Sequence, residues 1–368
     1  MSTSDPAASQ SEALPLTSPA SPRSEALRAW AIRSLPECGL FVAFLLLVLA
    51  LAATEPNFRT QSNVLEILDQ ASIILIVGVP FAMLLIARHV DLSVGSGIAA
   101  IGVIGARLMN GGTNTLVACA AMMGVALVVG VVNGTLCSYL RFSPIVVTLG
   151  MLAALRGLAF LLESENYDTG FSHAFHYIGQ GRLRLGDIPI KVVIAAGVVG
   201  LGATFLYRTV GGKHVQAIGA NPTASYLVGV KVKRVGFGLY VATALAVGLA
   251  AIIQISELDS GPANVSDGFE IAVLTAVLLG GVAFSGGRGS IFGVVLGALF
   301  IDTLANGFVH WGLSTDQVRL TNGGVLVVAA GMQAFSVWVG DRTRGGGRAR
   351  LASAASALRS APLRSRQP

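Results

Sequence analysis

The stretch LVACAAMMGVALVVGVVNGTL, Leu116–Leu136, decides the class of fold. It contains no charged residue, and its length matches the roughly 20 apolar residues that a helix needs to cross the hydrocarbon core of a bilayer. In water, such a segment would expose a large apolar surface. We therefore predict that Leu116–Leu136 is a transmembrane helix.

The rest of the chain has the same character. Its 368 residues are 53% hydrophobic and 12% charged, and the mean hydropathy is +0.71. Soluble domains carry about 25% charged residues, so a soluble globule is a poor fit. The 45 glycines also suit a membrane protein, because small residues let membrane helices approach closely. We predict an all-α polytopic membrane protein.

About ten apolar runs are long enough to be considered as spans. They are Cys38–Ala53, Ala71–Ala87, Leu92–Leu108, Leu116–Leu136, Ile145–Leu162, Ile190–Tyr207, Gly236–Ser256, Ile271–Phe284, Ser290–His310 and Leu320–Val339. Several are short or interrupted by glycine, so two or three are expected to be broken or re-entrant. Such breaks are tolerated where the protein or a wet cavity satisfies the freed backbone groups.

Two tails flank the predicted transmembrane domain, residues 38–340. Residues 1–37 are rich in Ser, Ala and Pro and are predicted to be a disordered cytoplasmic tail. Residues 341–368 are rich in arginine and are predicted to be a basic cytoplasmic tail.

The distribution of basic residues predicts the orientation in the membrane. If the N-terminus is cytoplasmic, the cytoplasmic loops carry Arg88, Arg141, Arg208, Lys213, Lys231, Lys233, Arg234 and Arg288. Lys and Arg are enriched in cytoplasmic loops, so both termini are expected in the cytoplasm. The net charge of +6 is then an orientation signal, and we expect no nucleic-acid partner.

The cytoplasmic loop Thr209–Val235 is predicted to contain a short helix. Asn221 is a suitable N-cap, Pro222 suits the first helical position, and Gly229 is a suitable end. One face of this helix would carry Ala224, Leu227 and Val228. The helix would either contact a soluble partner or rest on lipid headgroups, and the residues favour neither. The external loop Glu163–Pro189 is polar and aromatic, which suits a cap or a docking surface.

Polar residues inside the predicted spans are candidates for a translocation path, since each is costly in hydrocarbon. They are Arg156, Thr243, Ser256, Asp302 and Asn306. For Arg156 we favour a structural role, as an interior ion pair with Asp302. Glycines spaced four residues apart, at Gly130 and Gly134 and at Gly289, Gly293 and Gly297, are predicted to pack helices within one subunit rather than at a dimer interface.

No enzymatic site is expected. The sequence contains no phosphate-binding G-x-x-x-x-G-K-[ST] segment and no nucleophile–base pair or metal-ligand cluster. Cys38, Cys119 and Cys137 have neither metal nor disulfide spacing, and we interpret them as small packing residues.

Several motifs occur in one order along the chain. They are Asp91-Leu92-Ser93-Val94-Gly95-Ser96, Asn133-Gly134, Pro144–Gly150, Arg156-Gly157-Leu158-Ala159, Ala217–Asn221, Gly268-Phe269-Glu270, Leu279-Gly280-Gly281, Gly286–Gly289 and Asn306-Gly307. In this order and spacing, the chain resembles the permease subunits of ABC importers for ribose, galactose, xylose and related monosaccharides. The family-motif residues that we single out are Asp91, Ser93, Gly95 and Glu270.

The resemblance implies an assembly and an activity. It implies a permease fold similar to the vitamin B12 importer class, in the bacterial inner membrane, which imports a pentose, hexose or deoxy sugar. A second permease copy, identical or a close paralogue, would complete the core, and a periplasmic sugar-binding protein would dock outside. ATP and Mg²⁺ would be bound by a partner ATPase and no cofactor by this chain. The ATPase-coupling residues implied are Gly219, Asn221, Pro222, Ala224, Leu227 and Gly229.

Two alternatives remain open. An ion-gradient-driven secondary transporter normally needs intramembrane carboxylates or broken-helix ion sites, and Asp302 is the main candidate for such a carboxylate. A membrane scaffold without transport activity would bind partners but support no sugar flux.

Overall fold

The computed structural model describes residues 22–163, 170–184, 186–314, 317–318, 320–321, 323–328 and 331, with side chains from residue 38 onward. The helices are α1 Pro22–Thr54, α2 Gln61–Ile86, α3 Val94–Asn110, α4 Thr115–Gly134, α5 Pro144–Leu162, α6 His173–Gly179, α7 Ile190–Arg208, α8 Val210–Ala220, α9 Pro222–Leu227, α10 Val232–Leu258, α11 Phe269–Leu279 and α12 Ile291–His310. A 3₁₀ turn, η1 (Pro56–Arg59), precedes α2, and a π-helical turn, η2 (Thr135–Tyr139), extends α4. The strands β1 (Arg182–Leu183) and β2 (Ile188–Pro189) pair antiparallel.

The helical class predicted from the apolar runs is confirmed. Every predicted run from Cys38–Ala53 to Ser290–His310 overlaps a helix, and Leu320–Val339 extends beyond the described residues. Within the described part of the chain, 6 helices are long and apolar enough to cross a membrane: α2, α4 with η2, α5, α7, α10 and α12. The apolar part of α1, together with α3 and α11, is shorter.

The N-terminal boundary needs a correction. We predicted disorder up to residue 37, but α1 begins at Pro22. Pro22 occupies the first helical position, where its missing N–H costs nothing, and the following Glu-Ala-Leu-Arg-Ala residues favour helix. Local helix propensity therefore outweighs the polar composition from Pro22 onward, and residues 1–21 lie outside the described part.

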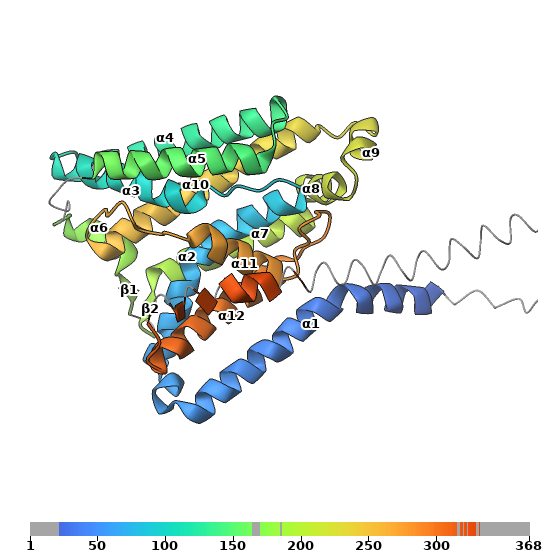
Figure 1. The fold of residues 1–368 in the computed structure, drawn as a ribbon, viewed down its shortest axis with the longest axis horizontal. Helices are drawn as coiled ribbons and strands as arrows, with labels where there is room; N and C mark the ends of the chain where they lie inside the picture. The colour runs from blue at the N-terminus through green and yellow to red at the C-terminus, as the bar shows by residue number, and fades with distance from the viewer. Residues whose placement is uncertain are drawn as a thin grey trace, which may run out of the picture.

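The helices form a layered bundle around α2 and α10. The helix α10 packs against α3 and α4 on one side and against α2 on the other, while α2 also packs against α7 and α12. Figure 1 shows α4 and α5 at one side of the bundle and α12 and α1 at the opposite side. The residues of α2 are nearly all buried from Ala71 to Ala87, which explains why this run is apolar on every face.

Close approach of glycine positions decides how the helices pack. A Cβ on Gly130 would lie 2.8 Å from the Ala244 side chain and 2.9 Å from the Val241 backbone on α10, and one on Gly297 would lie 2.0 Å from the Ala276 carbonyl oxygen on α11. Both spaced-glycine stripes thus pack helices within one chain, as predicted.

One buried cation joins three helices at the end of the bundle that carries α6. The Lys191 side chain on α7 is only 2% exposed, and its Nζ lies 2.6 Å from a carboxylate oxygen of Asp69 on α2 and 2.7 Å from one of Glu257 on α10. A buried charge of this kind stabilises only while its partners remain in place.

We therefore expect Lys191→Met to destabilise the fold by roughly 1.5–3 kcal/mol, because it removes charged hydrogen bonds and leaves two carboxylates facing each other. The melting temperature of the purified protein in detergent measures this. Lys213→Met is the matched control, since Lys213 is exposed and its loss should leave the melting temperature unchanged. Equal melting temperatures for the two variants would contradict the structural role of Lys191.

Candidate functional site

The two ends of the bundle carry different features. Figure 1 shows α8 and α9 together at one end, which we call the α9 end, and α6 with β1 and β2 at the other, which we call the α6 end. Two non-helical segments, one before α3 and one before α11, lie between these ends. Each of these places carries residues singled out in the sequence.

The short helix predicted at the α9 end is confirmed. Asn221 is its N-cap, and the Oδ1 atom of Asn221 accepts a hydrogen bond from the Ala224 backbone N–H at 3.0 Å. Pro222 is the first helical residue. Gly229 has a φ of 87°, a left-handed conformation that glycine adopts without steric cost, so the chain turns there as expected.

The tip of α9 is apolar and exposed. Tyr226, Leu227 and Val228 are 71%, 77% and 80% exposed, and Ala224 is exposed beside them. Three adjacent apolar side chains at the tip of a helix are typical of a contact surface for another molecule. Ala224, Leu227 and Val228 were predicted from the sequence to share one face. Tyr226 was not, because tyrosine carries a polar hydroxyl group as well as an apolar ring.

The helix α8 connects this tip rigidly to the bundle. A Cβ on Gly219 would lie 1.9 Å from the Ile86 carbonyl oxygen and 2.3 Å from the Gly287 nitrogen, so only glycine fits there. The Arg88 Nε donates to the Gly219 carbonyl at 2.7 Å, and its guanidinium also donates to the Ala220 carbonyl at 3.1 Å. The Gly287 N–H donates to the Ile86 carbonyl at 2.8 Å. The end of α8 therefore contacts both the end of α2 and the loop before α12.

The family resemblance implied Gly219 as a coupling residue, but neither Arg88 nor Gly287 was predicted to be its partner. The sequence offered only the local context of each residue as a signal. Arg88 directly follows an apolar run, and Gly287 lies in a glycine-rich turn. Their contacts join segments far apart in sequence, and such contacts require the folded structure.

A buried polar network holds the segment between α2 and α3. Asp91 is only 2% exposed. Its Oδ1 accepts hydrogen bonds from the Ser93 backbone N–H at 2.9 Å and the Ser93 hydroxyl at 2.5 Å, and its Oδ2 accepts one from the Asn133 amide at 3.2 Å. An adjacent cavity of about 10 Å³ has room for about one water molecule.

The non-helical segments before α3 and α11 lead to the same place. A Cβ on Gly95, near the start of α3, would lie 2.3 Å from a carboxylate oxygen of Glu270, at the start of α11, and 2.8 Å from the Ser266 carbonyl oxygen. At 17 and 11 residues, the two helices rise roughly 26 and 16 Å, less than the roughly 30 Å of a hydrocarbon core. Both helices are thus shorter than a full span, and the motif residues Gly95 and Glu270 are in contact.

Arg156 supports the second broken segment, residues 259–268. One guanidinium nitrogen of Arg156 donates to the Ala263 carbonyl at 2.7 Å and the Val265 carbonyl at 3.1 Å, and another lies 3.6 Å from a carboxylate oxygen of Asp267. The predicted ion pair with Asp302 is wrong. A non-helical segment leaves carbonyls without helical partners, and the donors of an Arg side chain satisfy two of them here.

The other residues predicted to line the translocation path are buried or form hydrogen bonds within this chain. The Thr243 hydroxyl donates to the Leu239 carbonyl of its own helix at 2.9 Å. Ser256 contacts α6, whereas Asp302 and Asn306 are buried on α12. The structure brings Asp302 and Asn306 together on one helix and does not bring either to Arg156.

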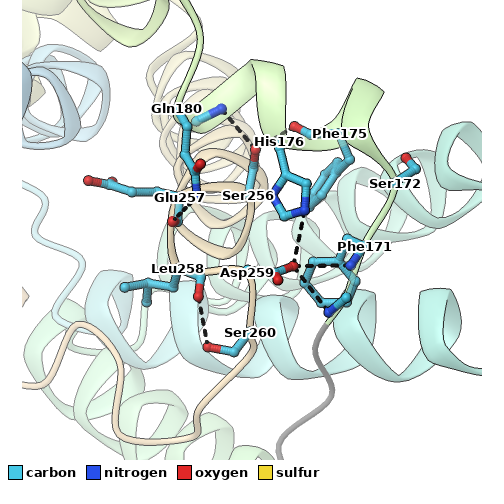
Figure 2. Close-up of polar contacts among 12 residues, drawn as sticks. Phe171, Ser172, Phe175, His176, Gln180, Ser256, Glu257, Leu258, Asp259 and Ser260 are labelled. Carbon is cyan, nitrogen blue, oxygen red and sulfur yellow. Dashed lines mark hydrogen bonds and ion pairs between the residues drawn. The ribbon is translucent and has the colours of Figure 1, made fainter.

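At the α6 end, Asp259 fastens the segment before α6 to the end of α10 (Figure 2). Its Oδ1 accepts hydrogen bonds from the backbone N–H groups of Gly170 at 3.2 Å and Phe171 at 3.0 Å, and the His176 Nε2 lies 3.3 Å from it. Asp259 ends α10 in a left-handed conformation, with φ of 52°. One carboxylate oxygen thereby organises three groups of the neighbouring segment.

Ser256 and Gln180 hold α6 itself on α10. The Ser256 hydroxyl donates to the Phe175 carbonyl at 2.5 Å and accepts from the Gly179 N–H at 2.8 Å. The Gln180 side chain donates to the Glu257 carbonyl at 2.8 Å (Figure 2). The loop Glu163–Pro189, for which we expected a cap or a docking surface, thus contains a short helix bonded to the end of α10, as far as the described residues show.

Comparison with known proteins identifies related chains. Residues 63–330 match the family model described as branched-chain amino acid transport system / permease component. The chain is 32% identical over 307 residues to Ribose import permease protein RbsC of Escherichia coli (strain K12), covering 82% of this chain and 94% of the relative. It is 31% identical over 291 residues to the L-arabinose ABC transporter permease protein AraH of Azospirillum brasilense, covering 79% and 85%.

A third relative has a similar length. The chain is 28% identical over 321 residues to the Galactose/methyl galactoside import permease protein MglC of Salmonella typhimurium, covering 82% of this chain and 95% of the relative. No solved structure matches this chain.

The junction at Gly219 generates a direct prediction. Gly219→Ala is expected to destabilise the protein by about 1–3 kcal/mol or more, because the new methyl group overpacks two backbone atoms that cannot yield cheaply. The melting temperature in detergent measures the effect, and protease cleavage near α9 should become faster. Gly238→Ala on α10 is the control, because a Cβ there meets nothing within 4 Å, and alanine is the better helix former. A Gly219→Ala protein as stable as the control would contradict the tight junction.

Proposed function

The chain belongs to the family of transport-system permease components, and we propose that it is the membrane-spanning subunit of an ABC importer for a monosaccharide. It is a multi-pass protein of the inner membrane and a permease for sugar import. The observation that carries the proposal beyond family membership is the exposed apolar helix α9, held rigidly to α2 and the loop before α12.

The substrate class follows from the relatives. The family description names branched-chain amino acids, but the relatives described above, which match about four fifths of the chain, are named for ribose, L-arabinose and galactose. We propose a pentose, hexose or deoxy sugar as the substrate of this chain. These sugars share a ring with several hydroxyls, so the path needs polar groups but no fixed charge complementary to the substrate.

The proposed coupling surface is the helix α9 with its flanking residues. Gly219, Asn221, Pro222 and Gly229 shape it, while Ala224 and Leu227 would contact a cytoplasmic ATPase. ATP and Mg²⁺ are proposed to bind to that partner alone, because the sequence has no phosphate-binding loop of its own. Docking of Tyr226 and Leu227 into an apolar pocket would offset the cost of exposing them in the free subunit.

The proposed translocation path lies beside the broken segments. Arg156 precedes the end of α5, at Leu162, by six residues, or about 9 Å. The side chain of Asp267, which pairs with Arg156, is 61% exposed, and an exposed charge at this depth is costly in lipid. Asp267 is therefore proposed to face a wet path shared with a second permease copy. Thr243, Ser256, Asp302 and Asn306, which the sequence suggested for the translocation path, would lie deeper in the subunit than the surface at Asp267.

The finer architecture is also part of the proposal. We propose about ten spans in a fold similar to the vitamin B12 importer class, with both termini cytoplasmic. The α9 end is then cytoplasmic and the α6 end periplasmic, where a sugar-binding protein would dock. In the mechanism that we propose, ATP binding to the partner moves α9, and the junction at Gly219 transmits that movement to α2 and α12. Such a change requires contacts that differ between the two states, and the ATPase supplies them.

Reconstituted transport tests the proposal. In proteoliposomes that contain this chain with its ATPase and sugar-binding protein, uptake of labelled ribose, L-arabinose or galactose should require ATP. Leu227→Asp should reduce uptake at least about tenfold, since that corresponds to only 1.4 kcal/mol of docking free energy, while the melting temperature of the subunit stays unchanged. Leu227→Met keeps the apolar contact and should keep the uptake.

Two outcomes would contradict the proposal. Sugar uptake driven by an ion gradient in the absence of ATP would favour a secondary transporter. Full uptake by the Leu227→Asp variant would show that α9 is not the coupling surface.

Side-specific labelling tests the orientation. In a background with Cys38, Cys119 and Cys137 replaced by serine or alanine, Val228→Cys should react with a membrane-impermeant maleimide from the cytoplasmic side. Tyr177→Cys, on α6, should react from the periplasmic side, since both positions are exposed, at 80% and 56%. The reverse pattern would overturn the proposed topology.

A further inference from the structure

The helix α12 carries a buried polar stripe that the proposed transport mechanism does not use. Asp302, Asn306 and His310 follow one another at four-residue spacing, which places them on one face of the helix. Asp302 and Asn306 are only 8% and 6% exposed. Asn63, near the start of α2, contacts the last two members of the stripe.

The hydrogen bonds of this stripe have only one possible direction. The Asn63 Nδ2 donates to the Phe58 carbonyl at 3.2 Å, so the Asn63 Oδ1 is the atom that faces α12. That oxygen accepts from the Asn306 Nδ2 at 2.9 Å and lies 3.0 Å from the His310 Nε2. An amide oxygen only accepts, so the proton of His310 is on Nε2. The Asn306 Nδ2 therefore has a hydrogen-bond partner, whereas the Asn306 Oδ1 still needs one.

Two buried acceptors are left over. The Asn306 Oδ1 and the Asp302 Oδ2 have no hydrogen-bond partner among the described residues. They belong to side chains four residues apart on the same helix face, which are neighbours on an α-helix. Two acceptors cannot satisfy each other, but one added proton turns the Asp302 carboxyl into a donor. A single proton therefore removes both unsatisfied groups.

Among the residues whose side chains the structure describes, none provides a cation for an ionised Asp302. The elements that pack against α12 are α1, α2, α7 and α11. Their described titratable groups are Cys38 on α1, Glu66 and Asp69 on α2, Lys191, Tyr207 and Arg208 on α7 and Glu270 on α11, and α12 itself adds His310. None of these forms a described hydrogen bond or ion pair with Asp302. An unpaired carboxylate in an apolar interior is costly, so the neutral acid is the form that suits this site.

We propose that Asp302 is a proton-binding site: its carboxyl is held protonated and donates from Oδ2 to the Asn306 Oδ1. The donors then run in series from Asp302 to Asn306, from Asn306 to Asn63, and from Asn63 to the Phe58 carbonyl. Bonds in such a series strengthen one another. The bound proton thus joins the buried middle of α12 to the start of α2, with His310 at the α6 end as a second donor to Asn63. This proposal does not depend on which sugar, or which energy source, the transporter uses.

The test compares two substitutions at one position. Asp302→Asn provides an N–H donor of nearly the same shape, so its melting temperature in detergent at about pH 5 should equal that of the wild type. Asp302→Leu leaves the Asn306 oxygen unpaired and should melt lower by more than about 3 °C. The infrared spectrum keeps the test decisive if the leucine variant fails to fold. The difference spectrum between the wild type and Asp302→Asn should contain the carbonyl band of a protonated carboxylic acid. The difference spectrum between the wild type and the control Asp187→Asn, whose side chain is 67% exposed, should not contain it.

The dependence on pH gives an independent readout. If the folded state holds a proton that the unfolded chain releases above about pH 4, stability falls as the pH rises. Above about pH 5, the wild type should therefore lose stability relative to Asp302→Asn as the pH rises. Parallel pH profiles, or a carboxylate band in place of the acid band, would overturn the proposal. A melting temperature that rises with NaCl but not with choline chloride would also overturn it, in favour of a bound metal cation.

Discussion

The bilayer core provides no water to bond to backbone groups, and this constraint governs the whole structure. Most of the chain meets it with regular helices, whose hydrogen bonds are internal. The segments before α3 and α11 do not, so their polar groups need other partners. The carbonyls of Ala263 and Val265 receive the Arg156 guanidinium, and the segment before α3 is held by Asp91, Ser93 and Asn133. Charged and polar side chains in the interior thus maintain the broken helices.

The two non-helical segments also meet each other. Near the start of α3, Gly95 leaves just enough space for the Glu270 side chain at the start of α11. A region without regular backbone hydrogen bonds rearranges more easily than an unbroken helix. The proposed path therefore lies beside the part of the bundle best suited to change shape, while α2 and α10 form a rigid centre.

Short backbone contacts join the elements through which the proposed mechanism would pass a movement. At the α9 end, backbone contacts of Gly219 with Ile86 and Gly287 join three segments without flexible side chains between them. At the α6 end, Asp259 and Ser256 bond the cap to α10 through backbone N–H and carbonyl groups. On α12, a bound proton at Asp302 would do the same for α2. Each connection uses short polar groups, which tolerate little displacement.

Local chemistry determined much of this protein from its sequence alone. Apolar runs such as Leu116–Leu136 predicted the helices, and Asn221, Pro222 and Gly229 predicted α9, because capping and turn preferences act within a few residues. The partners of Arg156 and Gly219 were beyond such reasoning. Arg156 bonds residues more than 100 positions away, and its position in a span does not distinguish Asp302 from the carbonyls of a broken segment. Only the tertiary structure decides which distant groups meet, since helix packing places them within bonding distance.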